Sequence, residues 1–168
     1  MELSSNHLKL LDEIPHPLAI ILAGDPGQPG KRGGMTAAWL SRISFNPPLI
    51  VVSLSPERHT YELIKRYHYF TINLVSTALE DIALNVFGVY CGRNVDKFEL
   101  SGLKPACGRS VLAPVILNSP LVIECKFIQE FIVGDHVLIV GEVVDAYKGS
   151  TDTPLVYYRD EAVSIAAP

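Results

Sequence analysis

Two strands separated by a proline turn are encoded in the segment Met35-Thr36-Ala37-Ala38-Trp39-Leu40-Ser41-Arg42-Ile43-Ser44-Phe45-Asn46-Pro47-Pro48-Leu49-Ile50-Val51-Val52-Ser53-Leu54. We predict the first strand over 35–45 and the second over 49–54, because apolar and β-branched residues favour extended backbone in runs of this length. Prolines lack the N–H that a sheet requires, so the Asn-Pro-Pro sequence ends the first strand. The segment therefore predicts β structure on both sides of a turn.

The flanking segments predict two more strands and two helices. The uniformly apolar run 18–23 predicts a buried strand, and the glycine- and proline-rich segment 24–34 predicts a loop. Ser55-Pro56-Glu57 is typical of a helix start, and that helix is expected to run to about Tyr67. A strand over 69–75 follows. Thr77 and Glu80 have the spacing of a capping box, which predicts a second helix over 78–90.

The C-terminal half is predicted to be β structure after a polar loop at 91–96 and a short helical turn that ends at Gly102. Strands are expected near 104–117, 121–132, 137–147 and 155–158, with a hairpin turn at Val133-Gly134-Asp135-His136. Six or seven strands with two helices do not alternate as βαβ units, so a Rossmann sheet is not expected. The pattern favours a closed or partly closed antiparallel barrel, which is a mainly β fold.

The composition predicts one domain and excludes several partners. The 168 residues are 48% apolar and 19% charged, which is enough to build a core, and the net charge is −4. This charge gives no general attraction to nucleic acid or to an anionic membrane. No apolar run approaches the roughly 20 residues that span a bilayer. Three widely spaced cysteines and an N-terminal segment without signal-peptide features lead us to expect reduced thiols in the cytoplasm.

The sequence matches none of the common catalytic motifs that we considered. The glycine-rich loop has Asp25 where a P-loop requires its first glycine, and its glycines do not have the dinucleotide-binding spacing. The histidines show no metal-ligand spacing, and no nucleophile elbow is found. We therefore expect no metal ion and no catalytic side chain.

One local cluster remains, formed by Ser53, Ser55, Arg58, His59 and Thr60 at the end of a strand and the start of a helix. Its hydroxyl and cationic groups, together with the helix dipole, could bind a phosphate. Ordinary helix capping explains the same residues. The residues alone leave both interpretations open.

A resemblance to a known family favours the phosphate interpretation. The segments 35–39 and 43–54 resemble the signature of the flavin reductase-like, FMN-binding split-barrel family, which includes flavoredoxins and the reductase components of two-component monooxygenases. Further similar segments follow in the same order over about 15–158. They are Glu57–Ile64, Phe70–Leu74, Tyr90–Phe98, Gly102–Pro105 and Gly134–Val143.

The resemblance implies a split β-barrel with two or three short helices, as one domain over 1–168 with its core at about 15–158. It also implies positions for the cofactor. Thr36, Ala37, Ala38 and Trp39 correspond to positions along the flavin ring and ribityl chain. The FMN phosphate would be held by Ser53, Leu54, Arg58, His59 and Thr60, with Lys97 nearby. His136 corresponds to a histidine beside the exposed flavin face, where it could contact a nicotinamide.

The implied function is that of an FMN-dependent oxidoreductase, with FMN rather than FAD. It would take hydride from NADH or NADPH and pass electrons to free flavin or to a redox partner protein. A flavoredoxin-type electron carrier without NAD(P)H turnover is the alternative, and a binding module for another ligand is the third. Relatives build the flavin pocket between subunits, so a homodimer is expected. Two differences from the family pattern are Ala38, which offers only backbone groups, and a shorter segment between Gly92 and Arg93.

Overall fold

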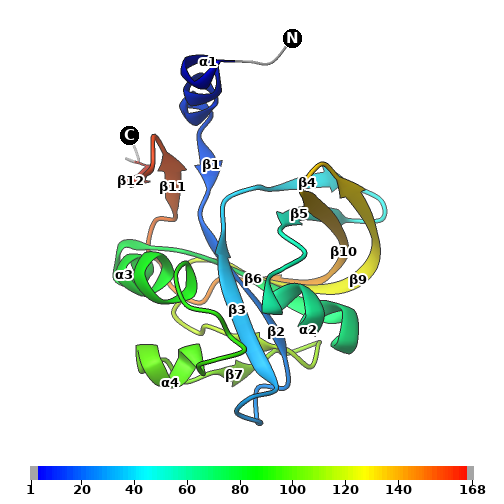
Figure 1. Cartoon of the computed structure of the whole chain (residues 1–168). Coiled ribbons are helices and arrows are strands. Elements are labelled where there is room, and N and C mark those ends of the chain that lie inside the picture. Colours follow the sequence, from blue (N-terminus) through cyan, green and yellow to red (C-terminus); the bar gives the residue numbers. More distant parts are fainter. Residues whose placement is uncertain (1–3, 166–168) are drawn as a thin grey trace.

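A curved antiparallel sheet of seven strands forms the body of the molecule in the computed structural model, which describes residues 4–165 (Figure 1). Its strands lie in the order β3-β2-β6-β9-β10-β5-β4. Their bounds are Ala19–Gly24 (β2), Arg32–Ala37 (β3), Leu40–Ser44 (β4), Leu49–Leu54 (β5), Tyr69–Leu74 (β6), Val122–Val133 (β9) and His136–Tyr147 (β10). The mainly β barrel expected from the sequence is confirmed.

The barrel is split where the two edge strands approach each other. The predicted single strand over 35–45 is wrong, because the backbone leaves β3 after Ala37 and begins β4 at Leu40 on the opposite edge of the sheet. The Leu40 amide donates to the Ala38 carbonyl at 3.1 Å, and the Ser53 amide of β5 donates to the Trp39 carbonyl at 2.9 Å. Ala38 and Trp39 thus form the crossing that joins the edges.

Strand β2 separates two apolar cores. Successive side chains of a strand point to opposite faces. Ile21 therefore packs inside the barrel with residues of β5, β6 and β10, whereas Ile20 and Leu22 pack into a second core beneath the helices. Both faces of β2 are buried, which explains why the run 18–23 is apolar throughout.

One end of the barrel is covered by helix α2, His59–Tyr67, which buries Leu63 and Ile64. The helix begins later than predicted. Ser55 instead starts a turn, in which its hydroxyl accepts from the Glu57 amide at 3.3 Å and its carbonyl accepts from the Arg58 amide at 3.1 Å. These bonds place the first helical residue at His59, with Arg58 in extended conformation as the preceding residue.

The second predicted helix is a series of short and irregular turns over the outer core. It consists of a 3-10 turn at Thr77–Leu79 (η2), a helical turn at Glu80–Ile82 (α3) and a π-helical turn at Ala83–Phe87 (η3). No side-chain cap is formed, so the predicted capping box is wrong. The Ala83 carbonyl accepts both the Gly88 amide and the Thr36 hydroxyl, which ties this segment to β3.

The remaining elements are short and lie outside the seven-stranded sheet. Among the described residues, the first elements are α1 (Ser5–Lys9) and η1 (Leu10–Glu13), and α4 (Lys97–Ser101) follows the polar loop. A three-stranded sheet is formed by β1 (His16–Pro17), β11 (Leu155–Tyr158) and β12 (Glu161–Ser164). The predicted strand over 104–117 is reduced to β7 (Ala106–Cys107) and β8 (Pro114–Val115).

The N- and C-terminal elements stand together, away from the barrel (Figure 1). Residues 1–3 and 166–168, which the single-domain prediction includes, lie outside the described residues. None of the helices within 4–165 is both long and apolar enough to cross a membrane.

Candidate functional site

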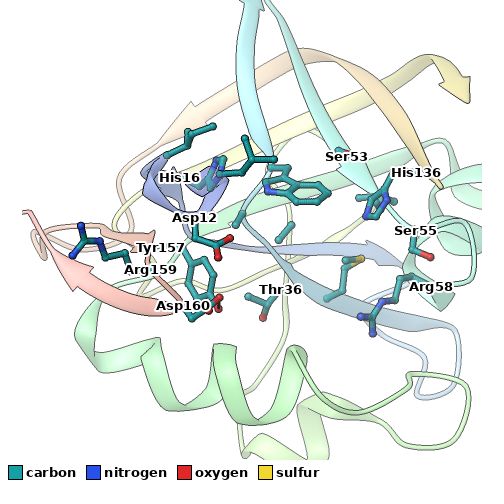
Figure 2. Close-up of a pocket in the computed structure, with 17 residues that line it drawn as sticks. Asp12, His16, Thr36, Ser53, Ser55, Arg58, His136, Tyr157, Arg159 and Asp160 are labelled. Carbon is teal, nitrogen blue, oxygen red and sulfur yellow. Dashed lines mark hydrogen bonds between the residues drawn. The ribbon is translucent and has the colours of Figure 1, made fainter. Parts of the chain in front are cut away.

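A groove of about 630 Å³ opens beside the crossing between β3 and β4 (Figure 2). One side is formed by β3, the crossing and the end of β5. The opposite side comes from η1 and the β11–β12 turn, and His136 also lines the groove. The lining residues are Leu11, Asp12, Ile14, His16, Met35, Thr36, Ala37, Ala38, Trp39, Ser53, Leu54, Ser55, Arg58, His136, Tyr157, Arg159 and Asp160.

The middle of the groove is mostly apolar and includes a partly exposed aromatic side chain. Met35, Ala37 and Leu54 are buried, whereas Trp39 remains 53% exposed. The ring centroids of Trp39 and His136 are 5.0 Å apart. The His136 Nδ1 atom lies 2.7 Å from the Asp135 carboxylate, and this hydrogen bond lowers the pKa of Asp135. An apolar floor beside an accessible aromatic wall suits a planar ring system.

A smaller cavity of about 250 Å³ adjoins the groove at its Arg58 end. The two share Met35, Ser55 and Arg58 as lining residues. The other residues that line the small cavity are Gly34, Glu57, His59, Thr60, Tyr90, Cys91, Gly92 and Lys97. Hereafter we call it the phosphate pocket, for the role that the sequence predicts.

Lys97 brings a buried cation to the phosphate pocket. Its Nζ atom donates to the carbonyls of Gly34 at 2.8 Å and Phe87 at 3.0 Å. An ammonium has three N–H donors, so one remains for a ligand. Burial, reinforced by the positive charge of Arg58, lowers the pKa of Lys97 to about 8. An anion beside Lys97 would restore the charged form.

The start of α4 holds Lys97 in this position. The Asp96 carboxylate accepts from the backbone amides of Phe98 at 2.9 Å and Glu99 at 3.4 Å, which caps the helix. The same carboxylate forms a 2.9 Å salt bridge with Arg32 of β3, with both side chains only 10% exposed. Asp96 therefore fixes α4 against β3 on one side while Lys97 reaches the pocket on the other.

Helix α2 contributes its first two residues to the phosphate pocket. Thr60 is buried, and the Nδ1 atom of His59 is buried without a hydrogen-bond partner among the described residues. Burial lowers the pKa of His59, because it disfavours the charged imidazolium. The first backbone amides of a helix have no carbonyl partner within the helix, so a helix start favours an anion.

Comparisons with known proteins show the family of the chain. The sequence model described as "Flavin reductase like domain" matches residues 11–166. The chain belongs to the flavin reductase-like family. It is 31% identical over 160 residues to an uncharacterised protein of Aeropyrum pernix, covering 89% of the chain but only 60% of that relative. The chain thus spans less than two thirds of this relative, and it spans 64% and 62% of two further archaeal relatives.

Two further proteins are also similar to the chain. A flavin reductase of Pseudomonas putida is 28% identical over 150 residues, covering 89% of the chain and 83% of the relative. The solved structure of flavoredoxin from Desulfovibrio vulgaris (Miyazaki F) superposes with a TM-score of 0.81 at 30% identity, covering 92% of this chain and 88% of that chain.

The structure brings all of the predicted site residues to the two adjoining cavities. Those around the groove are Thr36, Ala37, Ala38, Trp39, Ser53, Leu54 and His136. Those around the phosphate pocket are His59, Thr60 and Lys97, and Arg58 lines both. Their roles toward a cofactor stay predictions of the family resemblance.

Sequence reasoning missed the far wall of the groove. This wall is formed by Asp12 and His16 from the N-terminal segment and by Tyr157 and Asp160 near the C-terminus (Figure 2). Pairing of β1 with β11 brings the segments together, and the Arg159 amide donates to the Asp12 carbonyl at 3.2 Å. No local motif predicts a contact between residues almost 150 positions apart. Only the pairing of β1 with β11 could have indicated this contact.

The residues present fit a flavin mononucleotide. The groove offers an apolar floor and the open edge of β3, whose outward N–H and C=O groups point away from β2. The pocket offers Arg58, a buried ammonium with a spare donor and the amides of a helix start. A planar ring therefore suits one cavity and a phosphate suits the other.

Proposed function

We propose that the chain is an FMN-binding oxidoreductase that takes hydride from NADH or NADPH and passes electrons to free flavin or to a partner protein. The observation that carries this proposal is the phosphate pocket with its buried Lys97, placed beside an apolar groove in a member of the flavin reductase-like family. FMN would then bind with its ring beside Trp39 and its phosphate between Arg58 and Lys97.

The chain's residues would position the cofactor rather than react with it. Thr36, Ala37 and Ala38 would present backbone groups to the polar edge of the ring. Arg58 and Lys97 would neutralise the phosphate, aided by Thr60 and the start of α2. A bound flavin supplies hydride acceptance and one- or two-electron transfer, so the protein needs no acid or base of its own for these steps.

Trp39 and His136 would determine what can approach the ring. Their ring centroids lie 5.0 Å apart, and the His136 Nδ1 atom lies 2.7 Å from the Asp135 carboxylate. A nicotinamide would have to stack within this groove, because a split barrel has no separate nucleotide-binding half. His136 would contact the nicotinamide there, as the family resemblance implies.

Steady-state oxidation of NADH and NADPH by the purified protein tests the proposal. We expect one of the nucleotides to be oxidised continuously when FMN is added, and only slowly when FMN is left out. A protein that oxidises neither nucleotide, with FMN or with FAD, would contradict the reductase function.

An electron carrier of the flavoredoxin type is the second candidate. It is favoured by the similarity to flavoredoxin, which at 30% identity covers most of both chains. Such a carrier would retain FMN without exchange and would be reduced only by a protein donor. Retention of FMN through desalting, together with no reaction with NADH or NADPH, would distinguish it from a reductase.

A homodimer in the cytoplasm completes the proposal. Large apolar side chains remain exposed on the barrel, among them Phe45 at 82% and Ile132 at 83%. A second copy of the chain would cover such surface and could complete the open side of the groove. Cys91, Cys107 and Cys125 are free thiols, which supports a reducing compartment.

A further inference from the structure

Cys91 lies on the open side of the phosphate pocket. It lines the pocket and is exposed to solvent, as are three other lining residues, Glu57, Arg58 and Tyr90. Lys97 lines the same pocket but is only 4% exposed. A molecule that enters from solvent toward the buried ammonium would therefore pass the Cys91 thiol.

Arg93 places a positive charge beside the Cys91 sulfur. The Arg93 Nη1 atom donates to the Cys91 Sγ atom at 3.8 Å and to the Glu57 carbonyl at 3.0 Å. A salt bridge with Glu62 holds the same guanidinium. Hydrogen bonding to the Arg93 backbone and then to its side chain lowers the pKa of the Cys91 thiol, and the charge of Lys97 adds to this effect. The thiolate is the nucleophilic form of cysteine, so these contacts favour reaction at Cys91.

The buried ammonium of Lys97 is an independent indication that the pocket receives an anion. Among residues 4–165, neither Lys97 nor Arg58 forms a salt bridge with a carboxylate. The Lys97 Nζ atom uses two of its three donors on backbone carbonyls, which do not neutralise its charge. This charge would attract a phosphate, and it would equally attract an anionic reagent that approaches Cys91.

We propose that Cys91 is a reversible modification site for small anionic disulfides, such as glutathione disulfide, and that the adduct and a phosphate exclude each other from the pocket. The exclusion rests on the proposed function, since it takes the pocket to be the flavin phosphate site. An excess of such disulfides would then release the flavin.

The modification is a thiol–disulfide exchange. The Cys91 thiol loses its proton to water, and its thiolate attacks one sulfur of the disulfide. A bond forms between the Cys91 Sγ atom and that sulfur while the S–S bond of the reagent breaks, and the other half leaves as a thiolate with the electron pair. Cys91 is oxidised and the leaving half is reduced. A free thiol in excess reverses the step.

Rates of thiol reaction test the site. The dianionic disulfide DTNB is added to Cys107→Ser, which keeps Cys91, and to Cys91→Ser, which keeps Cys107. Cys107 is the matched control, because it is exposed but its Sγ atom contacts the Val111 carbonyl at 4.0 Å rather than a cation. Burial raises the pKa of Cys125 to about 12, so this thiol should not contribute. We expect Cys91 to react roughly tenfold or more faster than Cys107. With the neutral reagent dithiodipyridine, the ratio should fall at least about threefold.

Pocket ligands should protect Cys91. Saturating FMN should slow its reaction with DTNB at least about fivefold, and inorganic phosphate should also slow it, whereas riboflavin should not. The rate of Cys107 should stay unchanged throughout. Conversely, Cys107→Ser that carries a glutathione adduct, verified by mass spectrometry, should bind FMN at least roughly tenfold more weakly in calorimetry. Dithiothreitol should restore the affinity, and the same disulfide treatment should not alter FMN binding by Cys91→Ser.

The outcomes separate the modification from the proposed function. Equal rates of Cys91 and Cys107 with DTNB would overturn the modification site, and an equal ratio with the neutral reagent would overturn its preference for anions. If FMN binds but does not protect Cys91, or if the adduct leaves FMN affinity unchanged, the exclusion is wrong while the flavin site stands. If no flavin binds the unmodified protein, the proposed function fails, and the thiol rates with and without inorganic phosphate still decide this proposal. Peptide mass mapping of the labelled wild-type protein reads both cysteines if a variant does not fold.

Discussion

Lys97 is the residue whose chemistry the site alters most. Its ammonium is buried against two backbone carbonyls and faces Arg58, and its pKa falls to about 8. A phosphate dianion would stabilise the charged form and raise this pKa again. Below pH 8 the ammonium is already charged before binding. Above pH 8 it must first take up a proton, so binding becomes coupled to pH.

The affinity for FMN should therefore decline as the pH rises above about 8, by at most about tenfold per pH unit for one coupled proton. Calorimetric titrations from pH 7 to pH 10 measure this slope. In Lys97→Met the slope should vanish, and FMN should bind roughly tenfold or more weakly at pH 7 because a charged hydrogen bond is lost. Riboflavin affinity should change little in the same variant. A slope that persists in Lys97→Met would assign the proton to another group.

Among the elements, some were predictable and others were not. Strand β5 has the predicted bounds because its apolar run is bordered by Pro48 and Ser55. The break at Ala38 and Trp39 has no local signal, since both residues fit a strand, and the barrel's closure alone requires the chain to cross there. The π-helical turn over 83–87 was not predictable either. Thr36 and Lys97, which lie elsewhere in the sequence, donate hydrogen bonds to its backbone carbonyls.

Close packing of β3 against β2 predicts the effect of one substitution. A Cβ atom on Gly34 would lie 2.3 Å from a methyl carbon of Leu22 and 2.7 Å from the backbone carbonyl oxygen of Ile21. Gly34→Ala should lower the free energy of unfolding by about 1–3 kcal/mol, as overpacking does. Gly27→Ala is the matched control, since its Cβ atom would meet just Asp25 at 3.4 Å. Urea unfolding of the variants measures both effects, and equal stability of the two would refute the packing argument.

For the molecule as a whole, the candidate site joins segments from both ends of the sequence. The family resemblance located the side formed by β3, β5 and α2, because its motifs are local. The side formed by Asp12, Tyr157 and Asp160 depends on β1 pairing with β11, which no motif encodes. The exposed apolar tip of the β9–β10 hairpin likewise becomes evident only in three dimensions, with Phe131, Ile132 and Val133 all at least half exposed.

This hairpin tip predicts how the proposed homodimer responds to substitution. The wild-type protein should have about twice the 18.4 kDa mass of one chain at micromolar concentration in light scattering. Ile132→Glu should shift it toward the monomer, because a charge would be buried in the interface. Leu117→Glu, at a side chain that is 61% exposed, is the control and should leave the mass unchanged. A wild-type monomer would contradict the dimer.

The visible spectrum of the purified protein tests directly whether the chain binds FMN and reduces it. It is recorded after incubation with FMN and desalting, and again after anaerobic addition of NADH or NADPH. We expect the protein to carry FMN before the nucleotide is added and to lose the absorption of oxidised flavin afterwards with at least one of the nucleotides. A protein that stays colourless after incubation with FMN would contradict a flavin site between Trp39 and Lys97.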